Sequence, residues 1–182
     1  MTRSSAGRGN WPFGPTSLSN PISFARPGLM SRTIVVDDPV VAGLLNRLPS
    51  AAALGHSRRS FLEHLLCTWR ILADWRMPVA VCRAGFMHSA YSTSFYPHAL
   101  FSLDERDAVT HMIGREAEEL AFRFCTMDRR GFWDALVKRP RSGTLTYPNR
   151  LRAGAPVRVS RQTLRSLLII KRQHCRTGPN RG

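Results

Sequence analysis

The stretch Ser60–Ser89, SFLEHLLCTWRILADWRMPVAVCRAGFMHS, predicts two consecutive helices and decides the fold class. Its first half opens with a capping box, because Ser60 and Glu63 lie three residues apart ahead of an apolar run. Apolar side chains then recur at helical spacing to the end of that half. Pro78 marks the start of the second helix, which carries few charges and ends near His88. So few charges in a short helix are typical of a central element with neighbours on every side.

The sequence outward from this stretch predicts three more helices, at residues 39–48, 103–127 and 132–136. The first has two aspartates ahead of its proline, and the second opens with another capping box. No run of alternating apolar residues in this region is strong enough to predict a strand. The expected fold class is therefore all-α, a compact helical bundle.

The composition divides the chain into three parts. Residues 1–35 are rich in Gly, Pro, Ser and Asn and are expected to be a disordered extension. Residues 36–138 are expected to form the helical domain. Residues 139–182 are expected to be a basic, weakly structured segment with one weak helix near residues 160–172.

The net charge of +15 follows the same division. Residues 31–137 carry 12 basic and 12 acidic groups, whereas residues 138–182 carry 12 basic groups and no acid. The excess basicity therefore lies in the extensions and says little about what the folded part recognises.

Several protein classes are disfavoured by what the sequence lacks. No apolar stretch approaches the roughly 18 residues of a membrane span, and no secretory signal pattern opens the chain, so the predicted compartment is the cytoplasm. The four cysteines lie too far apart to present paired thiolates to zinc, and they are expected to be reduced and mostly buried. They are Cys67, Cys82, Cys125 and Cys175.

Three histidines and one aspartate are the candidate metal ligands. His56 precedes the first quoted helix, His64 lies in its second turn, and His88 ends the next helix. Asp128 ends a later helix. Helical bundles hold metals where side chains from several helices converge, and imidazole with carboxylate suits manganese, iron or zinc.

Each of these residues also has a structural interpretation. His64 borders an apolar face and can be a buried histidine bonded to a carbonyl, and His88 can cap its helix. His56 can simply start its helix. Asp128 precedes two arginines and can form an ordinary surface ion pair.

Two segments resemble the first two helices of the HD superfamily of metal-dependent phosphohydrolases. They are Phe61-Leu62-Glu63-His64 and Val81-Cys82-Arg83-Ala84-Gly85-Phe86-Met87-His88-Ser89. The resemblance covers about residues 54–136, and it implies that His64, His88 and Asp128 are metal ligands. The chain resembles one group more closely, namely uncharacterised bacterial HD-like proteins that have a His-Ser pair followed by a tyrosine and a threonine. Here these are His88, Ser89, Tyr91 and Thr93.

The superfamily has an aspartate where this chain has Ser89. A hydroxyl binds a divalent cation more weakly than a carboxylate does, so the resemblance leaves open whether this chain hydrolyses a phosphate ester. If it does, we expect Asp128 and His56 to take part in the chemistry, with His56 as a ligand or proton carrier. Tyr91 and Arg106 are candidates for contacting a bound phosphate or cofactor. Arg106 on a solvated helix face is the alternative.

Three functions from different classes follow from this sequence. The first is metal-dependent hydrolysis of a small phosphate ester or nucleotide. The second is a non-catalytic helical domain that binds a small ligand or acts as a scaffold. The third, ranked last, is nucleic-acid binding through the arginine-rich C-terminal segment.

Overall fold

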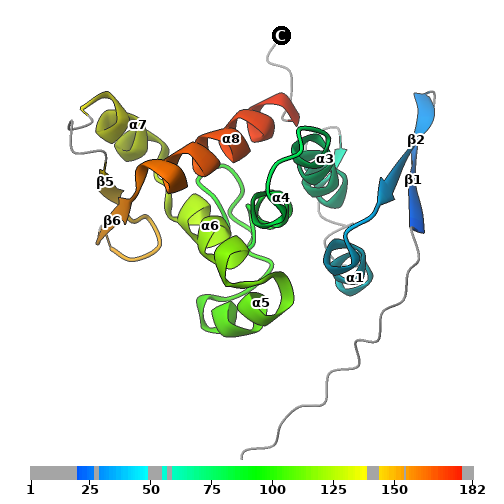
Figure 1. Cartoon of the computed structure of the whole chain (residues 1–182), viewed down its shortest axis with the longest axis horizontal. Helices are drawn as coiled ribbons and strands as arrows, with labels where there is room; N and C mark the ends of the chain where they lie inside the picture. Colours follow the sequence, from blue (N-terminus) through cyan, green and yellow to red (C-terminus); the bar gives the residue numbers. More distant parts are fainter. Residues whose placement is uncertain are drawn as a thin grey trace, which may run out of the picture.

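The fold is known from a computed structural model that describes residues 20–26, 29–48, 55–56, 59–138, 144–153 and 155–177. This described part is mostly helical, with small two-stranded antiparallel sheets beside the helices (Figure 1). None of its helices is long and apolar enough to cross a membrane. The helices are α1 (Pro39–Arg47), α3 (Phe61–Asp74), α4 (Val79–Phe86), the 3-10 turn η1 (Leu103–Glu105), α5 (Arg106–Ile113), α6 (Arg115–Thr126), α7 (Arg129–Val137) and α8 (Arg161–Thr177).

The strands correct the prediction of an all-α fold. A hairpin of β1 (Asn20–Arg26) and β2 (Leu29–Val36) lies in the segment expected to be disordered. At its end Ile34 and Val36 are buried while Val35 between them is half exposed, which is the alternation of a strand with one covered face. Two further pairs are β3 (Gly55–His56) with β4 (Arg59–Ser60), and β5 (Leu145–Pro148) with β6 (Pro156–Val159). Residues 1–19 lie outside the described residues.

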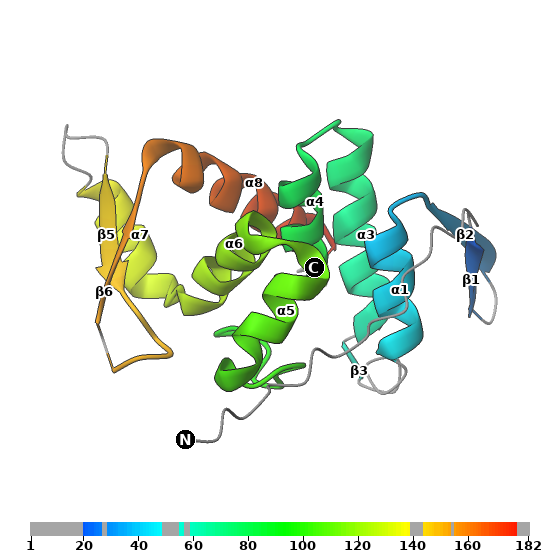
Figure 2. The same cartoon turned by 60° about the horizontal axis from the view of Figure 1, so that its bottom comes forward.

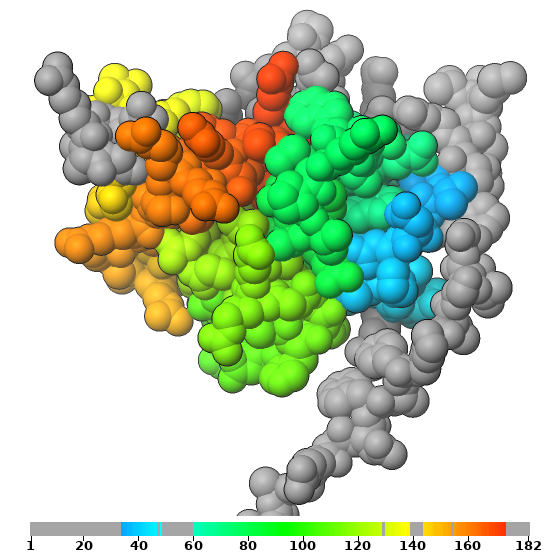
Figure 3. Space-filling view, viewed as in Figure 1, coloured from blue at the N-terminus to red at the C-terminus, as the bar shows by residue number. Residues whose placement is uncertain are grey.

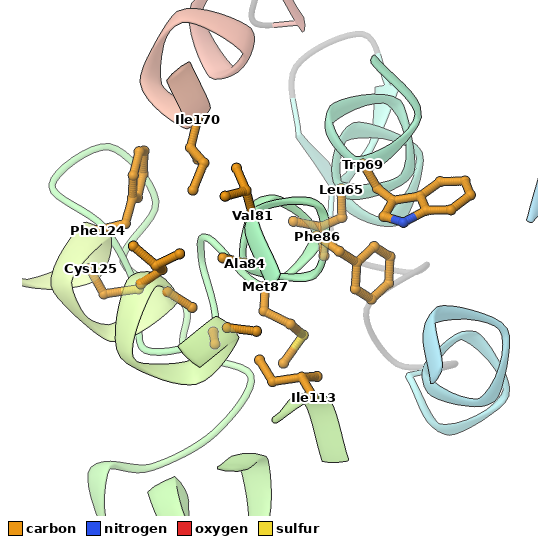
Figure 4. Close-up of a cluster of buried hydrophobic side chains, with 14 of the residues drawn as sticks. Leu65, Trp69, Val81, Ala84, Phe86, Met87, Ile113, Phe124, Cys125 and Ile170 are labelled. Carbon is orange, nitrogen blue, oxygen red and sulfur yellow. The ribbon is translucent and has the colours of Figure 1, made fainter. Parts of the chain in front are cut away.

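Helix α4 is the centre of the bundle. It packs against α3 on one side and α6 on the other, and α8 lies across all three. Figure 4 shows Leu65 and Trp69 of α3, Ile113 of α5 and Ile170 of α8 converging around it. The predicted central role of this short, weakly charged helix is confirmed.

The local signals for α1 and α3 are also confirmed. The Asp38 side chain accepts a hydrogen bond from Val40 N, and the Ser60 hydroxyl accepts one from Glu63 N, so each caps its helix as expected. Asp38 also forms a two-point ion pair with Arg83, at 2.8 and 3.1 Å, which ties the start of α1 to α4.

The long helix expected at residues 103–127 is divided. Gly114 has φ +92°, a conformation that residues with a side chain rarely adopt, and it separates α5 from α6. The glycine is also the C-cap of α5, so the chain turns there and α6 starts in a new direction (Figure 2).

The segment after residue 138 is more ordered than the sequence predicted. The hairpin β5–β6 contributes buried Leu145, Tyr147 and Val159, and α8 buries one face against α3, α4 and α6. That face consists of Leu164, Leu167 and Ile170. The correction has a simple reason: this helix is stabilised by distant partners rather than by its own arginine-rich sequence.

Gly85 permits the close approach of α4 to α3, the two helices that carry the candidate histidines. A Cβ at Gly85 would overlap the side chain of Leu72, which is fully buried and has little room to move. We expect Gly85→Ala to lower the free energy of unfolding by about 1–3 kcal/mol, measured by urea denaturation.

Gly43 of α1 is a matched control, because a Cβ there meets no atom within 4 Å. Gly43→Ala is expected to be neutral or stabilising by up to about 1 kcal/mol. In a Leu72→Ala background, Gly85→Ala should cost almost nothing. Equal losses from Gly85→Ala in both backgrounds would show that the overlap with Leu72 is not the cause.

Candidate metal centre

The two imidazoles predicted on neighbouring helices meet inside the bundle. His64 lies in the first turn of α3 and His88 lies just after the end of α4. Their Nε2 atoms are 3.1 Å apart, and their rings meet edge to face with centroids 5.0 Å apart. Both side chains are almost completely buried, at 1% and 0% exposure. The prediction that His64 and His88 lie together is therefore confirmed.

His88 is held by both its ring and its backbone. Its Nδ1 is 2.7 Å from the carbonyl oxygen of Gly85, and its ring packs edge to face against Phe124 of α6. The thiol of Cys125 donates a hydrogen bond to the His88 carbonyl oxygen. Burial raises the pKa of that thiol to about 12, so Cys125 stays protonated and keeps this bond at neutral pH.

These contacts determine where the protons of the neutral pair lie. A carbonyl oxygen only accepts, so the Nδ1 of His88 must carry a hydrogen. In a neutral imidazole the other nitrogen then accepts, and the Nε2–H of His64 donates to the Nε2 of His88. Without a cation the pair is thus a buried imidazole–imidazole hydrogen bond.

The 3.1 Å separation of the two Nε2 atoms equals that expected for two ligands of one metal ion. Two nitrogens that bind one ion at about 2.0–2.1 Å, with an angle between a right angle and a tetrahedral one, lie about 3 Å apart. The Nδ1–H of His88 that faces a carbonyl is the usual orienting bond of a metal-binding histidine. The tautomer of His64 has to change before both Nε2 lone pairs can bind an ion.

Among the described side chains, Asp128 does not complete a set of three with His64 and His88. Among the side chains that the structure describes, no group of three His, Cys, Asp or Glu residues is placed to hold a metal. Asp128 instead caps α7, where its Oδ2 accepts a hydrogen bond from Gly131 N. It also lines a shallow depression with Arg130, Trp133 and Asp134. The ligand role of Asp128 stays a prediction.

His56 and Ser89 flank the histidine pair along the chain. The backbone of His56 lies in β3, which pairs with β4 at the start of α3, and its side chain lies outside the described residues. Its roles as ligand and proton carrier therefore stay predictions. Ser89 follows His88 directly and is 1% exposed. Ser89 is thus inside the protein, next to the histidine pair in the sequence.

Tyr91 and Arg106 are engaged by a buried carboxylate. The Tyr91 hydroxyl donates to Glu118 Oε1 at 2.9 Å, and Arg106 donates to both Glu118 oxygens at 2.7 and 2.8 Å. Arg106 also donates to Glu119 and lies over the ring of Phe122, with 3.5 Å from guanidinium carbon to ring centroid. Its charge is thus balanced by two acids, which differs from the solvated alternative, and its role in contacting a phosphate stays a prediction.

The electrostatics of this cluster agree with its geometry. The hydrogen bond to Glu118 is the main cause that raises the pKa of Arg106. Burial, and then the same carboxylate, raise the pKa of Tyr91. Both groups therefore keep their protons at any ordinary pH, and Tyr91 is a hydrogen-bond donor rather than a base.

Glu118 was not predicted as a site residue, and the structure shows that it is buried, with 3% of its surface exposed. The signal was present, because it lies in α6 next to Ala117 and one turn before Phe122, both buried. A single acid on such a face needs a cation beside it. Its partners lie 12 and 27 residues away, so spacing alone does not identify them.

The turn after His88 is fixed by the C-terminal hairpin. Ser92 has φ +65°, and its hydroxyl accepts a hydrogen bond from Arg150 at 2.8 Å. Arg150 N in turn donates to the carbonyl of Thr126 at the end of α6. The hairpin thus holds the segment that carries His88 and Ser89, a contact between residues far apart in the sequence.

The fold and this site define a helical domain with a buried pair of histidines on adjacent helices. A protein-family model described as "Domain of unknown function (DUF6817)" matches residues 45–129, from α1 to the first residue of α7. The chain is similar to that family over the part that contains both histidines. No curated protein and no solved structure matches the chain.

Proposed function

We propose that this chain contains an HD-like domain that binds one divalent transition-metal ion through His64 and His88 and hydrolyses a small phosphate ester or nucleotide. The observation that carries the proposal is the 3.1 Å separation of the two Nε2 atoms, with His88 oriented by the Gly85 carbonyl. Manganese, iron and zinc are the ions that suit imidazole ligands. Such an ion supplies Lewis acidity toward water and toward a phosphoryl oxygen.

The residues of the chain would divide the work as follows. His64 and His88 hold the ion. They belong to α3 and to the end of α4, two helices whose close approach Gly85 permits. Asp128, which the HD resemblance implies, and His56, which its position ahead of α3 indicates, are the further candidates for ligand or proton carrier. The Glu118 cluster keeps Tyr91, and with it the turn after His88, in one position.

A second candidate is a non-catalytic domain that keeps the site as a structural feature. It is favoured by the complete burial of both imidazoles and by the pairing of Arg106 with two carboxylates. Restoring the superfamily carboxylate distinguishes the two candidates. An added acid raises turnover only where a cation and a substrate already bind.

We expect the full chain with manganese to hydrolyse p-nitrophenyl phosphate, and Ser89→Asp to raise kcat/KM by about tenfold or more. The matched control is Ser89→Asn, which has nearly the same shape without the charge and should bring no gain. Circular dichroism reports whether each variant is folded. No turnover by either folded protein with manganese, iron or zinc would leave the non-catalytic candidate standing.

A further inference from the structure

The outward face of α8 is a basic stripe. Arg161, Arg165 and Arg172 are exposed, and their spacing of four and seven residues places them on one side of the helix. The opposite side is the buried face of Leu164, Leu167 and Ile170. At 1.5 Å per residue the stripe is about 16 Å long. Because the apolar face of α8 is buried in the core, the side of the helix that carries these arginines faces outward.

Two half-exposed tryptophans lie beside the last turns of this stripe. Trp75 at the end of α3 is 40% exposed, and the guanidinium of Arg172 is 5.8 Å from its ring centroid. Trp133 of α7 is 41% exposed, and the ammonium of Lys171 is 5.6 Å from its ring. Lys171 and Arg172 are consecutive residues of α8, and each lies next to an indole. Arg172 lies on the α3 side, next to Trp75, and Lys171 lies on the α7 side, next to Trp133. We call these tryptophans, Lys171 and the three arginines the α8 surface.

A group of exposed acids lies away from α8. Four exposed acids belong to η1, α5 and the start of α6, at the opposite end of the bundle from α8 (Figure 1). They are Asp104, Glu105, Asp107 and Glu116. Of the acids nearer to α8, Asp74 is paired with Arg70, and Asp128 and Asp134 line the same depression as Trp133 and Arg130. In Figure 3 the orange atoms of β6 and α8 form one side of the visible face and the light-green atoms of α5 another.

We propose that the α8 surface binds single-stranded nucleic acid, an activity beyond the proposed hydrolysis. The arginines neutralise successive phosphates, and Trp75 and Trp133 offer rings on which exposed bases stack. Duplexes hide their base faces, so half-exposed indoles favour a single strand. An interfacial membrane helix needs a free apolar face, and the apolar face of α8 is in the core.

The test is fluorescence anisotropy of a labelled oligothymidylate with the full chain across a range of salt concentrations. We expect Arg165→Gln to weaken binding several-fold and to reduce the slope of log affinity against log salt by about 0.7. Trp133→Ala should weaken binding by about fivefold or more. The matched controls are Arg115→Gln on the exposed start of α6 and Phe95→Ala, an aromatic residue that is 50% exposed on a loop.

Three results would overturn the proposal. One is an equal loss from Arg165→Gln and Arg115→Gln, which would mean that only net charge matters. Another is unchanged binding by Trp133→Ala, which would remove the stacking of bases. The third is binding to phosphatidylserine vesicles without binding to the oligonucleotide, which would assign the surface to a membrane.

Discussion

Replacing Glu118 by alanine should lower the free energy of unfolding by about 3 kcal/mol, because the change leaves a partly buried guanidinium without its main partner. Glu118 is 4% exposed at its side chain and accepts hydrogen bonds from both Arg106 and Tyr91. Its loss also leaves the Tyr91 hydroxyl buried without this acceptor. The measurement is thermal and urea denaturation, and Tm should fall by about 6–12 °C for a chain of this size.

Glu119 provides the control for this prediction. It contacts the same guanidinium at 3.1 Å, but its side chain is 43% exposed, so Glu119→Ala should cost less than about 1 kcal/mol. The double variant Arg106→Met/Glu118→Leu replaces the pair by apolar side chains and should recover most of the stability that Glu118→Ala loses. If Glu118→Ala and Glu119→Ala lower the free energy of unfolding by similar amounts, burial of the Arg106–Glu118 ion pair is not the cause of its contribution to stability.

Divalent metal should stabilise the wild-type chain and neither histidine variant. At a concentration of about 100 times the Kd, a ligand of the folded state adds about 2.7 kcal/mol, which raises Tm by roughly 5–10 °C. His64→Ala and His88→Ala remove one Nε2 each and should abolish this rise with manganese or zinc. Without metal, each should also cost about 2 kcal/mol, because the partner imidazole loses its hydrogen bond.

His111→Ala is the matched control for the metal prediction. His111 is exposed, and its Nδ1 contacts the carbonyl oxygen of Asp107 within α5. Its replacement should leave the metal-induced rise in Tm unchanged. The same rise in wild type, His64→Ala and His88→Ala would place the bound metal elsewhere on the chain.

The elements that the sequence predicted are those with local signals. Asp38 and Ser60 cap α1 and α3 through atoms two and three residues away, so the signal and the contact lie within the same few residues. The elements that were missed, or were predicted as only weakly structured, depend on distant partners. Helix α8 is stabilised by contacts with α3, α4 and α6. The break between α5 and α6 was missed for another reason: a single glycine such as Gly114 is tolerated inside many helices, so its presence alone does not predict a break.

The candidate site divides in the same way. His64 and His88 were predicted from their places in one helix and at the end of the next, and from the resemblance to the HD superfamily. Glu118 was missed because its partners lie on other elements, and the positions of Asp128 and the hairpin that holds Ser92 depend on how α7 and β5–β6 dock. Residue types therefore indicated the candidate residues, and the tertiary packing determines which of these residues contact one another.

The claim that His64 and His88 form a metal site is tested most directly by elemental analysis of the untagged full chain after equilibration with manganese, iron or zinc and removal of free metal. We predict about one divalent ion per chain in the wild type and in His111→Ala, and none in His64→Ala or His88→Ala. A folded wild-type chain that retains no ion, or a His88→Ala variant that retains as much as the wild type, would contradict the claim.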